Sequence, residues 1–269
     1  MKREVACACA ALLMAGMSAM GGEIGVLTFG HEDKGAHPWV YPAAGGGYEG
    51  LDLEFMGLLA KELGVEIRLV AYPWQRCLIL MGEGQLDGAF ASSYKEDRER
   101  YGAYPRGADG EPDADKRIHT SGYSLYARKG SGIGFDGKKM VGLGEGRVGV
   151  QRGFSIVQDF DRMGIPYDDG TNDPEVLFRK LKMGRNPAVA VQTERAAAVL
   201  AGNEGLGDIE RIDLELDPFR PKPYYAMLSH QVLERDPAFG KRFWGAVEKV
   251  RKGEEYRKAA ARYGVAGEP

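Results

Sequence analysis

Hydrophobic positions along the first third of the chain alternate between two periods. Short apolar or alternating runs at Ile24–Phe29 and Val65–Val70 are typical of strands. Between them, apolar residues recur at helical spacing from Leu51 to Leu63, and Gly64 is a helix stop signal. A helix over 74–81 and a strand over 86–91 follow. This alternation predicts an open, mainly parallel sheet with helices on its faces.

A polar loop rich in Gly and Pro interrupts this rhythm over residues 102–120, and a second alternating set follows it. The strands expected in this set cover 123–127, 147–151, 188–191, 209–216 and 224–228. The helices expected between and after them cover 154–163, 174–183, 194–201, 237–250 and 254–262. The two half-chains therefore each predict a small α/β unit.

The first residues have the pattern of an export signal. A short, net-basic start precedes the uncharged run Val5–Met17, and small residues follow it. The run is too short for the roughly 20 residues of a membrane-spanning helix. We expect a signal peptide over residues 1–21, cleaved near Gly21 or Gly22; the alternative is an uncleaved N-terminal anchor.

Composition narrows the class of protein. Lys and Arg total 36 against 39 Asp and Glu, so there is no basic surplus of the kind that nucleic-acid binders show. A hydrophobic fraction of 43% and a mean hydropathy of -0.35 exclude a disordered chain and a polytopic membrane protein. After cleavage only Cys77 of three cysteines remains, so no internal disulfide is expected. An apolar run follows Cys77, which favours a core cysteine over a reactive thiol and suits a periplasmic protein stabilised by its core alone.

Three stretches, in order, resemble the family 3 periplasmic solute-binding proteins, of which many bind polar amino acids for ABC transporters. Gly47–Gly64 looks like the family's entry into its first helix. Pro73–Arg98 is similar to the family's second helix, its Gly-x-x-Asp strand and the Asp-Arg loop after it. Gly146–Ser155 resembles the opening strand of the second lobe. The resemblance covers nearly the whole mature chain.

The resemblance implies a two-lobed α/β clamshell of the periplasmic binding protein type II, with two strands as the hinge. Lobe 1 would comprise residues 23–121 plus 224–269, and lobe 2 residues 122–223. It also implies a monomeric periplasmic protein that captures a small polar, carboxylate-bearing ligand between the lobes and presents it to an ABC membrane permease. No cofactor, metal or nucleic acid is expected.

Arg98 is the main candidate for holding the carboxylate. It follows the third predicted strand, where strand ends face the cleft of an open α/β sheet. Its planar fork suits a carboxylate at two points, and by resemblance it is the family's carboxylate-binding arginine. Ser93 matches the family's helper hydroxyl, with backbone groups of Ala91 and Ser92 nearby. The alternatives are a solvated charge at Arg98, the neighbouring Arg100 in its place, and ordinary turn chemistry at the serines.

The second lobe is expected to meet the same anion at Gly153, Phe154 and Ser155, where a helix begins and its free N–H groups face outward. A plain helix cap explains this turn equally well. By resemblance, Gln192 occupies the position of the family's Asp that pairs with a ligand's α-ammonium. Because Gln carries no charge, the resemblance does not favour a standard amino acid as the ligand. Glu194 would substitute only if the register shifted by two residues.

Trp39 and Trp74 are the aromatic residues expected in the cleft, where rings stack on ligands, although core packing also explains them. Two other functions remain open: a periplasmic enzyme similar to cyclohexadienyl dehydratase, and a stand-alone ligand sensor. Glu194, Asp87 or His31 would be the acid or base of such an enzyme, but no paired-carboxylate motif marks it, so we predict no catalytic residue.

Overall fold

The computed structural model describes residues 24–214 and 216–265, so the expected signal peptide over residues 1–21 lies outside the described residues. None of the helices in the described part of the chain has the length and apolar character that a bilayer span requires.

A mixed five-stranded sheet forms lobe 1, in the order β4-β1-β5-β14-β6. Its strands are β1 (Val26–Glu32), β4 (Glu66–Tyr72), β5 (Gly88–Ser93), β6 (His119–Ser121) and β14 (Lys222–Leu228). β1 pairs in parallel with β4 and β5, whereas β14 runs antiparallel to β5 and β6.

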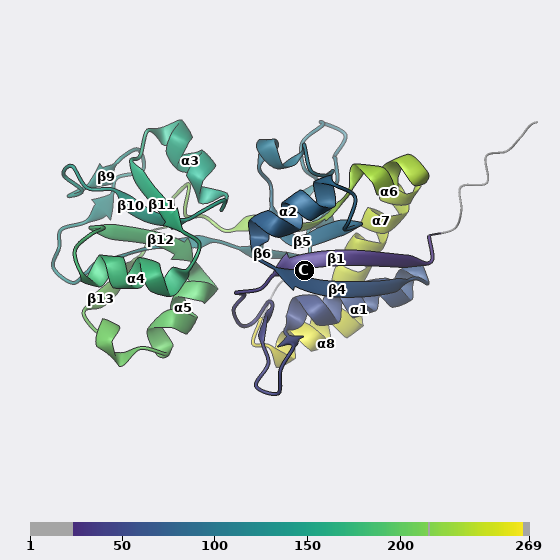
Figure 1. The fold of residues 1–269 in the computed structure, drawn as a ribbon, viewed down its shortest axis with the longest axis horizontal. Coiled ribbons are helices and arrows are strands. Elements are labelled where there is room, and N and C mark those ends of the chain that lie inside the picture. The colour runs from purple at the N-terminus through teal and green to yellow at the C-terminus, as the bar shows by residue number, and fades with distance from the viewer. Residues whose placement is uncertain (1–23, 215, 266–269) are drawn as a thin grey trace, which may run out of the picture.

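Helices cover both faces of this sheet. They are α1 (Leu51–Leu63), α2 (Trp74–Gly82), α6 (His230–Arg235), α7 (Phe239–Arg251) and α8 (Glu254–Arg262). Apolar side chains of α1, α7 and α8 pack with the sheet in one core cluster. Those of α2 pack in a second cluster against the opposite face (Figure 1). Each face is therefore sealed from water, as the alternating pattern predicted.

A second mixed sheet forms lobe 2, in the order β11-β10-β12-β7-β13. Its strands are β7 (Tyr123–Arg128), β10 (Val148–Gln151), β11 (Tyr167–Thr171), β12 (Ala188–Gln192) and β13 (Ile209–Ile212). β10 is parallel to β11 and β12, and β7 is antiparallel to β12 and β13. α3 (Ile156–Met163) packs on one face, and α4 (Pro174–Lys182) and α5 (Thr193–Ala201) pack on the other.

Short elements complete the described chain. They are the two-stranded ribbons β2 (Tyr41–Pro42) with β3 (Tyr48–Glu49) and β8 (Gly134–Phe135) with β9 (Met140–Val141), and the 3₁₀ turns Glu96–Arg98, Ala114–Lys116 and Glu204–Leu206.

The two sheets share no strand and lie side by side (Figure 1). The chain crosses from β6 to β7 through Gly122 alone, and it returns between β13 and β14. The expected two-lobed α/β architecture is confirmed, but the sheets are mixed rather than mainly parallel, with as many antiparallel as parallel pairings in each. The strands that enter after a crossing, β7 and β14, run antiparallel because they arrive from the other lobe rather than through a helix on the same sheet.

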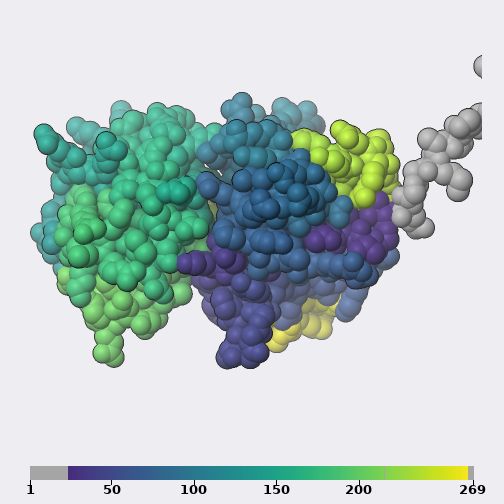
Figure 2. Space-filling model, viewed as in Figure 1, coloured from purple at the N-terminus to yellow at the C-terminus, as the bar shows by residue number. Residues whose placement is uncertain are grey.

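The lobes touch along their facing surfaces (Figure 2). The ion pair between Lys34 Nζ and Asp173 Oδ2, at 2.6 Å, joins the loop after β1 to the start of α4. The hydroxyls of Ser93 and Ser155 meet at 2.7 Å across the same boundary. The structure is therefore a closed form of the clamshell.

Cys77 lies in the core of lobe 1 and is fully buried. Its Sγ donates to the carbonyl of His31 at 3.3 Å. Burial raises the pKa of the thiol to about 12. A thiol of this kind is almost entirely protonated at neutral pH, so the interpretation as a core cysteine is confirmed.

Candidate functional site

A cavity of about 60 Å³ lies between the lobes, at the carboxyl ends of the parallel strands. Seven of the ten residues expected to contact ligand line it: Trp39, Trp74, Ala91, Ser93, Arg98, Phe154 and Gln192. The location is the one at which open α/β sheets bind small molecules.

Arg98 spans the boundary between the lobes. Its Nη1 donates to the carbonyl of Ser93 at 2.7 Å, and its Nη2 donates to the carbonyl of Gly153 in lobe 2 at 2.9 Å. The guanidinium lies over the ring of Trp74, 5.2 Å from its centroid. Only 4% of Arg98 is exposed, and its Nε is buried without a hydrogen-bond partner among the described residues. A carboxylate would give this group charged acceptors in place of two neutral carbonyls.

Arg100 does not share this position. It is exposed, does not line the cavity, and its Nη2 donates to the hydroxyl of Tyr101 at 2.7 Å. Of the two arginines in the Lys95–Arg100 run, Arg98 therefore lines the cavity and Arg100 does not.

Serine hydroxyls form a short chain beside Arg98. Ser93 Oγ donates to Ser155 Oγ, which lies 3.2 Å from the hydroxyl of Tyr123. Gly153 adopts a φ of +78°, which turns its carbonyl toward Arg98 at the start of lobe 2's first helix. Ser92 is different, because its side chain points to the hydroxyl of Tyr104 at 2.7 Å and does not line the cavity.

Ala91 has a φ of +57°, a left-handed conformation that costs a non-glycine residue free energy. It lies within β5, two residues before the strand ends at Ser93, and the ladder between β5 and β14 shifts register beside it. Ala91 and Ser93 both line the cavity. Strain of this kind collects at functional sites, and no sequence pattern indicated it.

The lobe 2 wall differs from the expected one. The Gln192 side chain is engaged at both ends: its Oε1 accepts from Arg195 Nε at 2.6 Å, and its Nε2 donates to the Tyr224 hydroxyl at 2.7 Å. Glu194 also lines the cavity, and its carboxylate accepts from Ser121 Oγ at 2.8 Å. A carboxylate therefore faces the cavity two residues beyond the expected position, where the first turn of α5 places it.

Arg195 was missed by the sequence analysis. Its guanidinium lies over the ring of Phe154, 5.2 Å from the centroid, and its Nη1 donates to the carbonyl of Lys34 in lobe 1. It is 9% exposed. Its position in the first turn of a helix, without a neighbouring motif, gave no signal of a role in the cleft.

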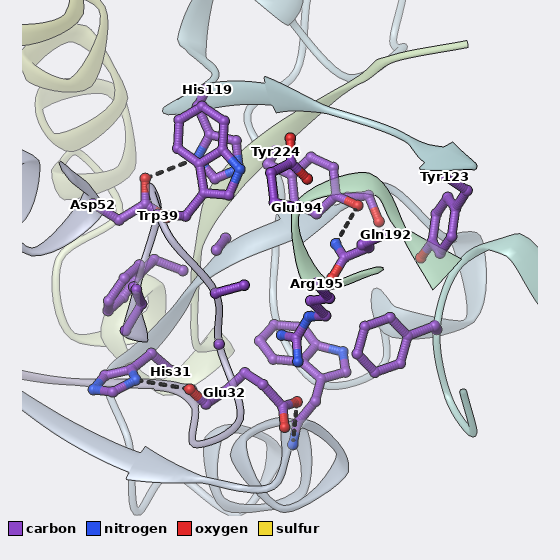
Figure 3. A pocket seen from close by; sticks show the side chains of 18 of the residues that line it. His31, Glu32, Trp39, Asp52, His119, Tyr123, Gln192, Glu194, Arg195 and Tyr224 are labelled. Carbon is purple, nitrogen blue, oxygen red and sulfur yellow. Dashed lines mark hydrogen bonds and ion pairs between the residues drawn. The ribbon is translucent and has the colours of Figure 1, made fainter. Parts of the chain in front are cut away.

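Glu32 ends β1 and accepts from the backbone N–H of Trp74 at 2.9 Å (Figure 3). Burial raises the pKa of its carboxyl to about 7, although the charge of Arg195 acts in the opposite direction. The carboxyl is therefore close to half ionised at neutral pH.

Within the described residues, no group of three or more His, Cys, Asp or Glu side chains is arranged to hold a metal ion.

Asp52 and His119 were also missed. Their contact, between Asp52 Oδ1 and His119 Nδ1, measures 2.8 Å, and both line the cavity (Figure 3). Gly50 allows Asp52 to lie beneath Trp39, because its φ is +139° and a Cβ there would come within 2.1 Å of the Trp39 carbonyl. That carbonyl accepts from the N–H of Asp52 at 3.0 Å.

The arrangement defines a class of protein: two α/β lobes closed on a small cavity, with a buried guanidinium at their boundary. The sequence pattern of one protein family, the bacterial extracellular solute-binding proteins, family 3, matches residues 27–266 of this chain. The chain belongs to this family. No curated protein sequence matches it significantly.

Solved structures share the fold at low sequence identity. An ancestral arginine-binding protein bound to arginine is 18% identical with a TM-score of 0.69, over 90% of this chain and 99% of that one. An ABC uptake transporter substrate-binding protein from Streptococcus pneumoniae with bound histidine is 15% identical with a TM-score of 0.67, over 88% and 92%. An ancestral amino acid-binding protein, a precursor of cyclohexadienyl dehydratase, is 19% identical with a TM-score of 0.64, over 89% and 95%.

Proposed function

We propose that this protein captures a small carboxylate-bearing solute between its lobes in the periplasm and delivers it to the permease of an ABC importer. The observation that carries the proposal is Arg98. Arg98 lines a cavity at the lobe boundary, and its buried Nε has no hydrogen-bond partner in the part of the chain that the structure describes. Such a guanidinium is suited to an anion that loses its water on closure.

The neighbours of Arg98 support an anionic group at this end of the cavity. Ser93 and Ser155 bring one hydroxyl from each lobe to its side. The first turn of α3 begins directly after Ser155, so its free N–H groups and positive dipole end lie close to the same point. A ligand held here contacts both lobes and stabilises the closed form.

The ligand's other substituents are less restricted. Glu194 offers a charged acceptor for an ammonium group, whereas Gln192 has no charge to offer. Amino acids and ammonium-free acids with the same skeleton are therefore both candidates. The relatives named above bind arginine or histidine, which places amino acids among the first compounds to test.

The test is a thermal-shift and tryptophan-fluorescence screen with amino acids, their 2-oxo and 2-hydroxy analogues, other organic acids and polyamines. Trp39 and Trp74 line the cavity, so their emission should report occupancy. We expect stabilisation by at least one carboxylate. A response to polyamines alone, or to no compound in the panel, would contradict the proposal.

A second candidate is a periplasmic enzyme of the same fold. Glu32 favours it, because a carboxyl with a pKa of about 7 can both accept and donate a proton near neutral pH. Incubation with prephenate and arogenate, followed by detection of the aromatic product, tests this candidate. Turnover would favour the enzyme, and binding without turnover would favour the solute-binding protein.

A further inference from the structure

Three rings stack at the end of the cavity formed by α1, β6 and β14. His119 lies between Trp39, with centroids 3.9 Å apart and planes inclined by 11°, and Tyr224, at 5.1 Å and 18° (Figure 3). Its Nδ1 pairs with Asp52 Oδ1. These four side chains form one rigid wall, which we call the stacked wall.

Two polar atoms of the stacked wall have no hydrogen-bond partner within residues 24–214 and 216–265: Asp52 Oδ2 and Trp39 Nε1. Asp52 is wholly inaccessible to solvent, and it lies in the first turn of α1, where the helix dipole favours its negative charge. A buried acceptor or donor without a partner is costly, and native proteins rarely leave one. The wall therefore holds one unpaired acceptor and one unpaired donor beside the cavity.

We propose that the stacked wall is a second ligand subsite, specific for an uncharged group that both donates and accepts a hydrogen bond, such as a carboxamide or a hydroxyl. The donor of that group would pair with Asp52 Oδ2 and its acceptor with Trp39 Nε1. This inference rests on the proposed function, because Arg98 must hold the carboxylate of the same ligand.

Each of the other common end groups leaves at least one of these two atoms unpaired. An ammonium only donates, so it leaves the Trp39 N–H unpaired. A carboxylate only accepts, so it leaves Asp52 Oδ2 unpaired and is repelled by the charge of Asp52. A methyl group leaves both atoms unpaired.

The sheet register sets the length of the ligand. Tyr224 pairs with Ser93 on one side and with His119 on the other, so Ser93 and His119 lie two strand spacings apart. Two spacings of about 4.8 Å separate these strands by roughly 10 Å, and a hydrogen bond of about 2.9 Å at each end leaves roughly 4 Å between the two end groups of the ligand. An acid with only a few carbon atoms between its end groups suits this span.

The test is calorimetric binding of two matched quartets to the wild-type protein. The first is glutamine, glutamate, ornithine and norvaline; the second is glutaramate, glutarate, 5-aminopentanoate and pentanoate, which lack the α-ammonium. Within each quartet only the end group changes. We expect the carboxamide to bind at least about tenfold more tightly than the other three in whichever quartet binds.

Equal binding within a quartet, or tighter binding of its charged members, overturns the second subsite and leaves carboxylate capture intact. Binding by none of the eight acids overturns the second subsite, whereas the wider screen described above decides carboxylate capture separately. Asp52→Asn should lower the ratio of carboxamide to carboxylate affinity by at least about tenfold. The exposed Asp213→Asn is the matched control and should leave the ratio unchanged. If Asp52→Asn fails to fold, the affinities of the two quartets for the wild-type protein still test the second subsite.

Discussion

Arg98 of lobe 1 and Arg195 of lobe 2 are placed in nearly the same way. Each lies over an aromatic ring of its own lobe at 5.2 Å, donates to an acceptor of its own lobe, and donates to a backbone carbonyl of the opposite lobe. The lobes therefore close on two arginines that cross the boundary in opposite directions.

The two arginines differ in what they leave unpaired. Arg98 keeps a buried Nε without a partner among the described residues, whereas the Nε of Arg195 is already paired with Gln192. The comparison indicates that Arg98 is prepared for a ligand and that Arg195 mainly holds the lobes together. On the function proposed above, similar packing would serve ligand capture at Arg98 and lobe closure at Arg195.

The largest effect is expected for Arg98→Met, which keeps the length of the side chain and removes its donors. Loss of a desolvated charged hydrogen bond should weaken carboxylate binding by about 2–5 kcal/mol. Calorimetry with an acid found in the screen measures this loss. Arg100→Met, on the exposed neighbour, is the control and should bind as the wild type does. Equal affinity of Arg98→Met and wild type would remove Arg98 from the site.

The next largest effect is expected for the pH dependence of stability and comes from Glu32. Burial raises the pKa of its carboxyl to about 7, although the charge of Arg195 partly opposes this rise. Between about pH 4.5 and about pH 7 the folded protein binds more protons here than the unfolded chain does. Wild-type stability should therefore fall relative to Glu32→Gln as pH rises through that window, by about 3 kcal/mol in total. Below about pH 4.5 the difference between the two proteins should stay constant.

Urea unfolding at several pH values between 4 and 8.5 measures this difference for wild type, Glu32→Gln and the exposed control Glu83→Gln. A stability difference between wild type and Glu32→Gln that does not change with pH would show that Glu32 keeps an ordinary pKa. Curves for Glu83→Gln should run parallel to the wild type throughout.

The smallest effect is expected for Arg195→Met. It removes a charged hydrogen bond to the Lys34 carbonyl across the boundary, worth about 2 kcal/mol of closure. The ligand-free protein should then populate open forms, seen as a larger radius of gyration in small-angle scattering. Ligand affinity should fall, but less than in Arg98→Met.

Arg211→Met, at an exposed position on β13, is the control for this variant. An affinity loss as large as that of Arg98→Met, with no change in radius, would mean that Arg195 binds ligand directly. That outcome would make the two arginines equivalent.

Local patterns determined much of this protein. The alternation of strand and helix periods predicted two α/β units, and nearly all elements appear within a few residues of their expected bounds. Arg98 was a candidate because the family resemblance was added to its place shortly after a parallel strand, whose end lies at the cleft. Hydrophobic periodicity and strand-end position are properties of short segments, so the sequence alone contains them.

Tertiary structure decided the rest. Asp52, His119 and Tyr224 come from a helix start, a short strand and a strand of the last third of the chain, and only the sheet register brings them together. Arg195 acquires its partner Lys34 only when the lobes close, and the strained φ of Ala91 follows from a register shift against β14. Contacts between segments distant along the chain depend on how whole sheets and lobes pack, and no window of neighbouring residues encodes that packing.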